Sequence, residues 1–107
     1  MYLVRRVCPT ERSNAWQVAN FLRKICEAYE ANGRRPATVY VGGMGVPGNS
    51  VTVCAEWTQD TIEPNRIPNV PEAVFTLSRE MQKLISSYHI EFYEIATKDG
   101  LAERGLS

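Results

Sequence analysis

Apolar residues recur along this sequence with two different spacings, and the order in which these spacings alternate strongly restricts the fold. Four segments are rich in β-branched and aromatic residues, and apolar side chains recur in them at every second position. Two other segments carry apolar residues three or four positions apart. The first period is typical of a β-strand and the second of an amphipathic helix, so the sequence predicts the order βαββαβ.

The first predicted strand covers residues 2–8 and ends at Pro9. Thr10 or Ser13 is expected to cap the helix that follows, which ends at residues 32–33, an Asn-Gly pair. This helix is predicted to bury an unusually wide face, because aromatic residues flank its apolar stripe on both sides. The stripe consists of Ala15, Val18, Ala19, Leu22, Ile25, Cys26 and Tyr29, and the flanking residues are Trp16 and Phe21.

Residues 38–44 and 50–58 predict two strands of a hairpin, because the segment between them is rich in glycine and proline. Residues 59–70 are expected to form a long surface loop, since Pro64 and Pro68 lie inside this segment. Prolines at this density are incompatible with regular structure.

Pro71 suits the first position of a second helix. A last strand is predicted over about residues 89–97, which completes a single domain over residues 1–97. Residues 98–107 are expected to be a loose C-terminal tail. The apolar stripe of the second helix is Val74, Leu77, Met81, Leu84, Ile85 and Tyr88.

Right-handed crossovers fold this order into a ferredoxin-like α+β domain. Its expected architecture is a four-stranded antiparallel sheet with both helices on one face. The hydrophobic content of 44% and the charged content of 22% are those of an ordinary globular protein.

Several classes of function find no support in the sequence. Twelve basic residues balance twelve acidic ones, so no net field favours a nucleic acid or an acidic membrane. Residues 50–57 lack the aromatic platform of an RNA-recognition domain, and residues 42–45 are not a GxGxxG motif. With no signal-peptide pattern and no apolar run of about 20 residues, a cytoplasmic protein is expected. Cys8, Cys26 and Cys54 lack zinc-site spacing and are expected to be structural thiols, so we expect no metal and no cofactor.

Each strand also has a set of side chains that faces away from the helices. This set is too apolar for a plain solvated face and too polar for a dry core. Either the face stays open to water, or two copies pack their sheets together around a polar-lined cavity. The second arrangement is favoured, because the apolar members would form a large exposed patch, and it predicts a homodimer. The set is Tyr40, Met44, Thr52, Cys54, Glu56, His89, Glu91, Tyr93 and Ile95, whereas Val51, Val53, Ala55 and Trp57 are expected to face the helices.

The turn and strand over residues 45–53, followed by Trp57, resemble the dimeric α+β barrel superfamily, and the hairpin is most similar to NIPSNAP-like domains. The resemblance implies a barrel closed by two copies, with a pocket for a small hydrophobic or aromatic ligand. The superfamily includes cofactor-free monooxygenases of polyketide rings, heme-degrading enzymes and lactone isomerases. Its heme-degrading members use an Asn on the first strand and a His on the second helix. Here the first strand has no Asn and the single histidine, His89, follows the helix, so heme degradation is not expected.

His89 is a candidate general base, because Glu91 shares its strand face and Glu56 lies on the same face of another strand. The alternative is that His89 makes a structural hydrogen bond at the junction of helix and strand. Arg5 and Arg6 point to opposite faces of the first strand, and the sequence does not fix which one enters the barrel. The expected ligand-binding residues are Tyr40, Thr52, Glu56, Tyr93 and Arg5.

The two tryptophans, Trp16 and Trp57, are expected to anchor the core or an interface rather than to bind a ligand. The sequence therefore predicts a small-molecule-binding dimeric α+β barrel, with cofactor-free monooxygenase or isomerase activity as the candidate reactions. The alternative is a non-catalytic dimerisation or protein-interaction module that uses the same face of the sheet.

Overall fold

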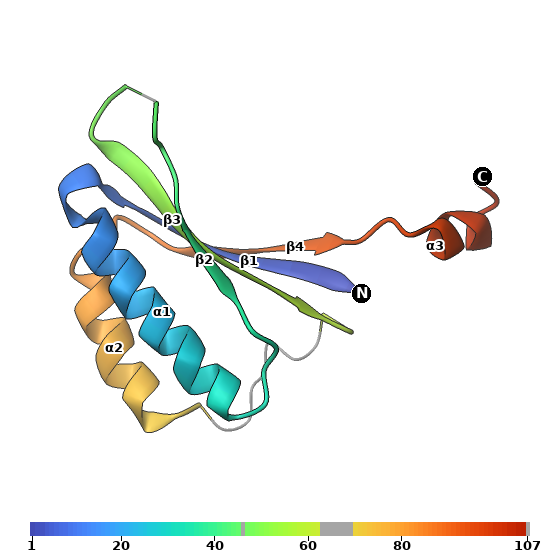
Figure 1. Ribbon diagram of the computed structural model, residues 1–107, viewed down its shortest axis with the longest axis horizontal. Helices are drawn as coiled ribbons and strands as arrows, with labels where there is room; N and C mark the ends of the chain where they lie inside the picture. The colour runs from blue at the N-terminus through green and yellow to red at the C-terminus, as the bar shows by residue number, and fades with distance from the viewer. Residues whose placement is uncertain (46, 63–69, 107) are drawn as a thin grey trace.

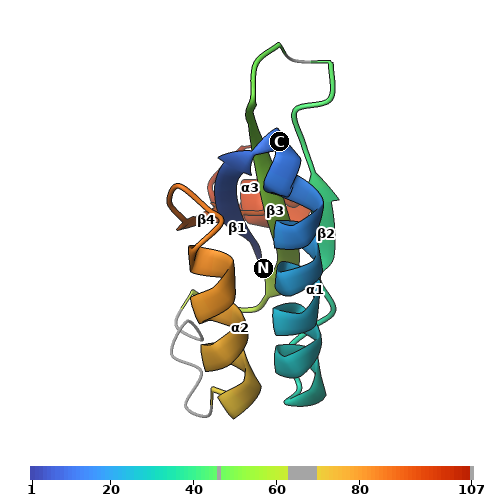
Figure 2. The same cartoon turned by 90° about the vertical axis from the view of Figure 1, so that its left-hand side faces the viewer.

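The predicted ferredoxin-like fold is confirmed in the computed structural model, which describes residues 1–45, 47–62 and 70–106. A four-stranded antiparallel sheet has the strand order β2-β3-β1-β4. The two long helices, α1 and α2, cover one face of this sheet and lie side by side (Figures 1 and 2). The predicted loop over residues 59–70 falls largely on residues 63–69, which lie outside the described part of the chain. The elements are β1 (Tyr2–Glu11), a short 3-10 turn η1 (Arg12–Asn14), α1 (Ala15–Ala31), β2 (Thr38–Val41), β3 (Ser50–Gln59), α2 (Glu72–Gln82), β4 (His89–Glu94) and α3 (Lys98–Glu103).

The core lies between the sheet and α1. The predicted apolar stripe of α1 is confirmed, because every residue of it is buried. Leu22 of α1 and Val53 of β3 are both fully buried. The alternation along β3 is also as predicted, since Val51, Val53, Ala55 and Trp57 are buried while the residues between them are half-buried. The spacing of apolar residues in the sequence therefore determines which face each helix and strand buries.

The first strand is longer than predicted, and Pro9 does not end it. The strand continues to Glu11, and Pro9 lies opposite Thr52 of β3. The Pro9 carbonyl accepts a hydrogen bond from the Ser86 N–H at 2.9 Å, so the proline nitrogen faces the same side. Because pairing between β1 and β4 stops at Val7, the missing N–H of Pro9 breaks no ladder bond. The sheet tolerates proline at such a position.

The predicted caps of the first helix are wrong. Asn14 occupies the N-cap position of α1 without a side-chain hydrogen bond, and Ser13 lies in the 3-10 turn before it. Thr10 is buried in β1 instead, where its hydroxyl donates to the Leu84 carbonyl at 2.6 Å. The cap is displaced because β1 continues past Thr10, and Thr10 bonds to the segment that follows α2.

The prediction that the buried face of α1 extends to Trp16 is also wrong, whereas an interface role for Trp16 stays a prediction. Trp16 is 69% exposed, whereas Phe21 packs partly against the core. At about 100° per residue, Trp16 lies about 120° from the centre of the stripe and Phe21 about 100° from it, on the other side. The helix α1 therefore packs against the core on the Phe21 side of its apolar stripe and not on the Trp16 side. Trp57 is the tryptophan that anchors the core.

The other boundaries shift by a few residues. β2 ends at Val41 rather than at residue 44, because the chain turns at Gly42 and Gly43. Gly43 has a φ of +88°, and a Cβ at this position would lie 2.8 Å from Cγ1 of Val51, so the turn requires glycine here. Pro71 is the N-cap of α2 rather than its first residue, and β4 ends at Glu94. The helix α2 itself ends at Gln82, so the last part of its predicted stripe lies beyond it. That part is Leu84, Ile85 and Tyr88.

Residues 98–103 form a short helix, α3, which the sequence analysis did not predict. Its N-cap is Thr97, whose side chain accepts a hydrogen bond from the Gly100 N–H at 3.0 Å. Arg104 reaches back to both carboxylate oxygens of Glu94 at 3.1 Å, which links α3 to the end of β4. Figure 1 shows α3 beyond the end of the sheet, away from α1 and α2.

Two of the three cysteines lie in the core. Cys8 and Cys26 are buried, whereas Cys54 is half-buried on the sheet face opposite the helices, and all three are free thiols. Burial raises the pKa of Cys8 to about 11, so this thiol is protonated at neutral pH. No helix in the described residues is long and apolar enough to cross a membrane.

Candidate functional site

The central strand β1 places two neighbouring arginines on opposite faces of the sheet. Arg5 lies opposite Glu56 of β3 and Glu91 of β4, so these three side chains share the face that the helices leave open. Arg6 therefore faces the helices, where it lines a cavity beneath α2. This register answers the question that the sequence left open, because Arg5 faces the side on which the barrel was predicted.

On the open face, five side chains from three strands form a connected polar cluster, here called the open-face cluster. Arg5 Nε lies 2.7 Å from Oε1 of Glu56, and Arg5 Nη1 lies 3.7 Å from Oε1 of Glu91. Glu91 also lies 3.2 Å from His89 Nε2 and accepts a hydrogen bond from the Tyr93 hydroxyl at 2.7 Å. The Arg5 guanidinium completes the cluster, 5.3 Å from the centre of the Tyr93 ring.

The structure brings together most of the residues expected at the site, but not all of them. Tyr40 lies opposite Cys54 on the edge strand β2, and Thr52 lies four positions before Glu56. Within the described residues, no hydrogen bond or ion pair joins Tyr40 or Thr52 to the open-face cluster. Glu56 bonds to Arg5 rather than to His89, so Glu91 is the carboxylate that contacts the imidazole.

The chemistry of the open-face cluster is that of a satisfied ion-pair network. The hydrogen bonds from Tyr93 and His89 lower the pKa of Glu91, and the bond to Glu91 raises the pKa of Tyr93. A carboxylate stabilised in this way is a weak proton acceptor at neutral pH. The cluster therefore suits an interface or a structural role better than acid-base catalysis, and the catalytic roles of His89 and Glu91 stay predictions.

Replacing Glu91 with glutamine is expected to change how stability depends on pH. Because the pKa of Glu91 is lowered in the folded protein, its stabilising effect is present above the unfolded-state pKa and is lost as the pH falls through the folded-state pKa. The difference in Tm between wild type and Glu91→Gln should therefore be larger at pH 7 than at pH 3. Thermal unfolding followed by circular dichroism measures it, with Glu103→Gln on the exposed surface of α3 as the control. A difference for Glu91→Gln that is the same at both pH values would contradict the lowered pKa.

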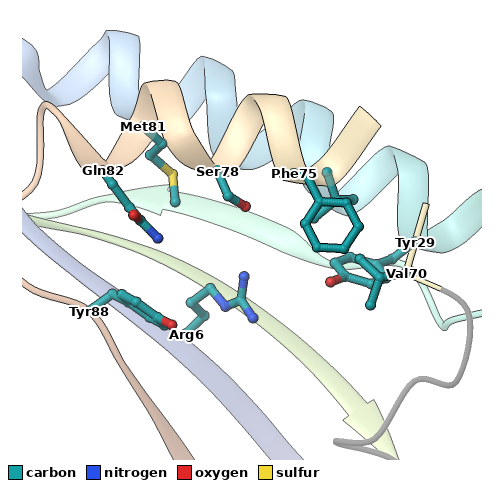
Figure 3. Close-up of a pocket in the computed structure, with 9 residues that line it drawn as sticks. Arg6, Tyr29, Val70, Phe75, Ser78, Met81, Gln82 and Tyr88 are labelled. Atoms are coloured by element: carbon teal, nitrogen blue, oxygen red, sulfur yellow. The ribbon is translucent and has the colours of Figure 1, made fainter. Parts of the chain in front are cut away.

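On the other face of β1, a cavity of about 270 Å³ lies between the sheet and α2 (Figure 3). Arg6 forms its floor on the sheet side, Tyr29 reaches it from α1, and α2 supplies most of the wall. The lining combines aromatic and aliphatic side chains with a few polar groups, as ligand pockets generally do. The residues are Arg6, Tyr29, Val70, Val74, Phe75, Ser78, Met81, Gln82 and Tyr88.

The polar centre of this pocket is the Arg6 guanidinium. Its Nε atom is buried and has no hydrogen-bond partner within the described part of the protein. The guanidinium carbon lies 5.9 Å from the centre of the Tyr88 ring, a cation–π contact, which uses the charge of the guanidinium rather than its N–H groups. Tyr88 was predicted as part of a buried helical stripe, but it is 53% exposed beyond the end of α2.

One wall of the pocket is fixed by a stack of three side chains. Arg34 lies over the ring of Trp57, 4.2 Å from its centroid, and 5.4 Å from the ring centroid of Tyr29. Trp57 donates from Nε1 to Oε1 of Gln59 at 3.1 Å, and Arg34 Nη2 lies 3.5 Å from Oε2 of Glu30. This stack joins the end of α1 to β3, so the Tyr29 ring is held in place at the pocket.

The pocket was not predicted from the sequence, because the predicted site lies on the opposite face of the sheet. The alternation of Arg5 and Arg6 showed that one arginine faces the helices, and only the strand register could tell which. Phe75 and Ser78 of α2 lie beside the apolar stripe rather than in it, so the helical period alone did not select them. In the described ranges, no group of three or more His, Cys, Asp or Glu side chains could hold a metal ion.

The sequence matches no protein-family model and no curated protein. Solved structures do match it over nearly its whole length. An antibiotic biosynthesis monooxygenase matches with a TM-score of 0.68 at 11% identity, over 91% of this chain and 100% of that one. The chain shares the fold of that monooxygenase.

Two further structures have the same fold. SnoaB from Streptomyces nogalater, a cofactor-independent oxygenase solved as a mutant, matches with a TM-score of 0.60 at 10% identity, over 91% of this chain and 95% of that one. A dimeric protein of unknown function and ferredoxin-like fold from Bacteroides fragilis NCTC 9343 matches with a TM-score of 0.59 at 14% identity, over 88% and 96%. At these identities the likeness establishes the ferredoxin-like fold, and the finer resemblance to NIPSNAP-like domains stays a prediction.

Proposed function

We propose that this protein binds a small aromatic compound in the pocket between β1 and α2 and oxygenates it without a cofactor. The observation that carries the proposal is the cavity of about 270 Å³, lined by Tyr29, Phe75 and Tyr88 around one arginine. The fold that holds this cavity is shared with a cofactor-independent oxygenase, which supports the reaction class. A function of this kind agrees with the ligand class expected from the sequence.

The lining favours oxygenation over isomerisation. An isomerase must remove a proton and return it, and the described lining offers no carboxylate and no imidazole for this task. Oxygenation needs no protein base when the substrate is an acidic phenol that ionises by itself. The reaction then converts a ring methylene and O2 into a ring ketone and water, with both electron pairs supplied by the substrate. The chain's own part is to bind the ring, orient it and hold water away from it.

We further propose that the protein is a homodimer whose two sheets meet through the open face. Tyr40 and Tyr93 are 48% and 43% exposed on this face, and a second copy would cover them. The edge strands β2 and β4 would also gain partners. A matching structure described as dimeric supports this assembly. The cytoplasmic location expected from the sequence stays a prediction.

The pocket is tested by filling it. Ser78 lines the cavity on α2, so the variant Ser78→Phe places a ring inside it, whereas Thr76→Phe adds the same ring to the exposed side of the same helix. With dithranol, a tricyclic phenol with an oxidisable methylene, oxygen uptake by the wild type should exceed the spontaneous rate in buffer. The Ser78→Phe variant should lose more than about 90% of this excess, because the substrate can no longer be held in a reactive position. Thr76→Phe should keep it.

Each outcome of this experiment decides one part of the proposal. Oxygen uptake that survives in Ser78→Phe would place the reaction outside the pocket. Binding of dithranol without oxygen uptake, seen as quenching of tyrosine and tryptophan fluorescence, would overturn the oxygenase activity but not the binding site. A dimer that neither binds nor oxidises dithranol would favour the alternative, a non-catalytic dimerisation module.

A further inference from the structure

We infer that the ligand of the pocket is an aromatic carboxylate, whose carboxylate binds Arg6 and whose rings extend toward Phe75. This inference rests on the proposed function, because it takes the cavity between β1 and α2 as the binding site. It adds the chemical class of the ligand and the direction in which the ligand lies.

The first support is the state of Arg6 compared with its neighbour in the sequence. Arg5 contacts two carboxylates on the open face, Glu56 and Glu91. Arg6 has no ion pair within the described residues, and its Nε is buried without an acceptor. Buried donors are nearly always satisfied in native proteins, so the Arg6 guanidinium, which lines the cavity, is left with donors for an acceptor that the described residues do not supply.

The second support is the charge of the lining. Among the described residues that line the cavity, Arg6 is the charged one, and the other polar members, such as Ser78 and Gln82, are neutral. An arginine presents its N–H groups in a planar fork, which matches the two oxygens of a carboxylate. A cationic ligand would meet Arg6 without a compensating acid, so the pocket selects against amines.

The third support is the arrangement of polar and apolar groups along the cavity. Figure 3 shows the Arg6 guanidinium pointing into the space below α2, with Tyr88 beside it. Phe75, Tyr29 and Val70 gather on the side of Arg6 that lies away from Tyr88. A ligand whose carboxylate binds Arg6 can therefore place its rings against this apolar group.

The size of the cavity limits the ligand further. Ligand pockets commonly enclose roughly 300–1,000 Å³, and this one measures about 270 Å³. A compound with one to three fused rings fits such a volume, whereas a dinucleotide does not.

A matched pair of probes tests the inference. At pH 7, 2-naphthoate carries a carboxylate, and 2-naphthamide has nearly the same shape without the charge. Isothermal titration calorimetry of the wild type should show naphthoate binding at least about tenfold more tightly than naphthamide, as expected for hydrogen bonds to a charged group. Arg6→Gln should remove this preference and leave the naphthamide affinity within about twofold. Arg6→Lys, which keeps the charge but not the fork, should retain part of the preference.

The control variant is Arg79→Gln, which removes an exposed arginine of α2 that does not line the cavity and should not change the preference. Equal affinities for both probes in the wild type, each abolished by Ser78→Phe, would overturn the carboxylate inference while the pocket remains the binding site. If neither probe binds, or if Ser78→Phe does not affect their binding, the proposed site itself is overturned. Circular dichroism spectra of all variants, with Arg6→Lys as the milder change, show whether a loss of binding comes from misfolding.

Discussion

Replacing Leu22 with alanine is expected to lower the free energy of unfolding by about 2–5 kcal/mol. Leu22 is fully buried at the centre of α1, where it packs in the core against β3. The truncation removes its apolar contacts and leaves a cavity that the rigid sheet cannot fill. Urea unfolding followed by circular dichroism, at one fixed protein concentration, measures the change.

The matched control for this variant is Lys24→Ala on the exposed side of the same helix. Lysine and alanine are both good helix formers, so this change should stay within about 0.5 kcal/mol of the wild type. A loss below about 1 kcal/mol for Leu22→Ala would mean that α1 does not cover the sheet as described.

Reversing the charge of Glu56 is expected to weaken the proposed homodimer strongly. In the dimer, Arg5 and Glu56 would lose their remaining contact with water. The Glu56 carboxylate lies 2.7 Å from Arg5 Nε, so Glu56→Lys would place a second cation beside Arg5. An unpaired charge at a desolvated interface is costly. The dimer dissociation constant should therefore rise by at least about 100-fold. Sedimentation equilibrium over a dilution series, with a monomer mass of 12.1 kDa, measures it.

The control for the dimer is Glu27→Lys on α1, which makes the same charge reversal at an exposed ion pair with Arg23. This variant should leave the dissociation constant within about threefold, because exposed ion pairs contribute little. A wild-type protein that is monomeric at all concentrations, or a dimer that Glu56→Lys leaves unchanged, would show that the open face is not the interface. Neither result would affect the pocket, which lies on the other side of β1.

The fold could be predicted from the sequence because it depends on the spacing of apolar residues and on turns marked by glycine and proline. The stripe of α1 and the alternation of β3 both follow from side-chain geometry that holds in any protein. The errors arose where tertiary contacts outweigh local preference. Pro9 looks like a strand breaker, yet its position next to the end of β4 makes the missing N–H harmless. Thr10 looks like a helix cap, yet it lies in the longer β1 and bonds to Leu84.

The candidate site was harder to predict, because it depends on the strand register. His89, Glu91, Tyr93 and Glu56 could be grouped in advance, since alternation alone puts them on one face. The pocket on the other face could not be predicted. Arg6 lines this pocket only because Arg5 lies opposite Glu56 on the open face and does not face the helices. A shift of one residue in β1 would exchange the two arginines, and no pattern in the sequence distinguishes the two registers.

The position of β1 at the centre of the sheet also restricts how this protein can diversify in evolution. Its two faces serve different purposes, since Arg5 belongs to the open-face cluster and Arg6 to the pocket. The insertion or deletion of one residue before this pair would damage both at once, so changes of length are expected to be excluded from β1 in descendants of this chain. The described residues of the turn between β2 and β3 belong neither to the open-face cluster nor to the pocket lining, so changes of length are expected there instead. New ligand preferences should therefore arise by substitution along α2, one side chain at a time, while the strand beneath it stays fixed.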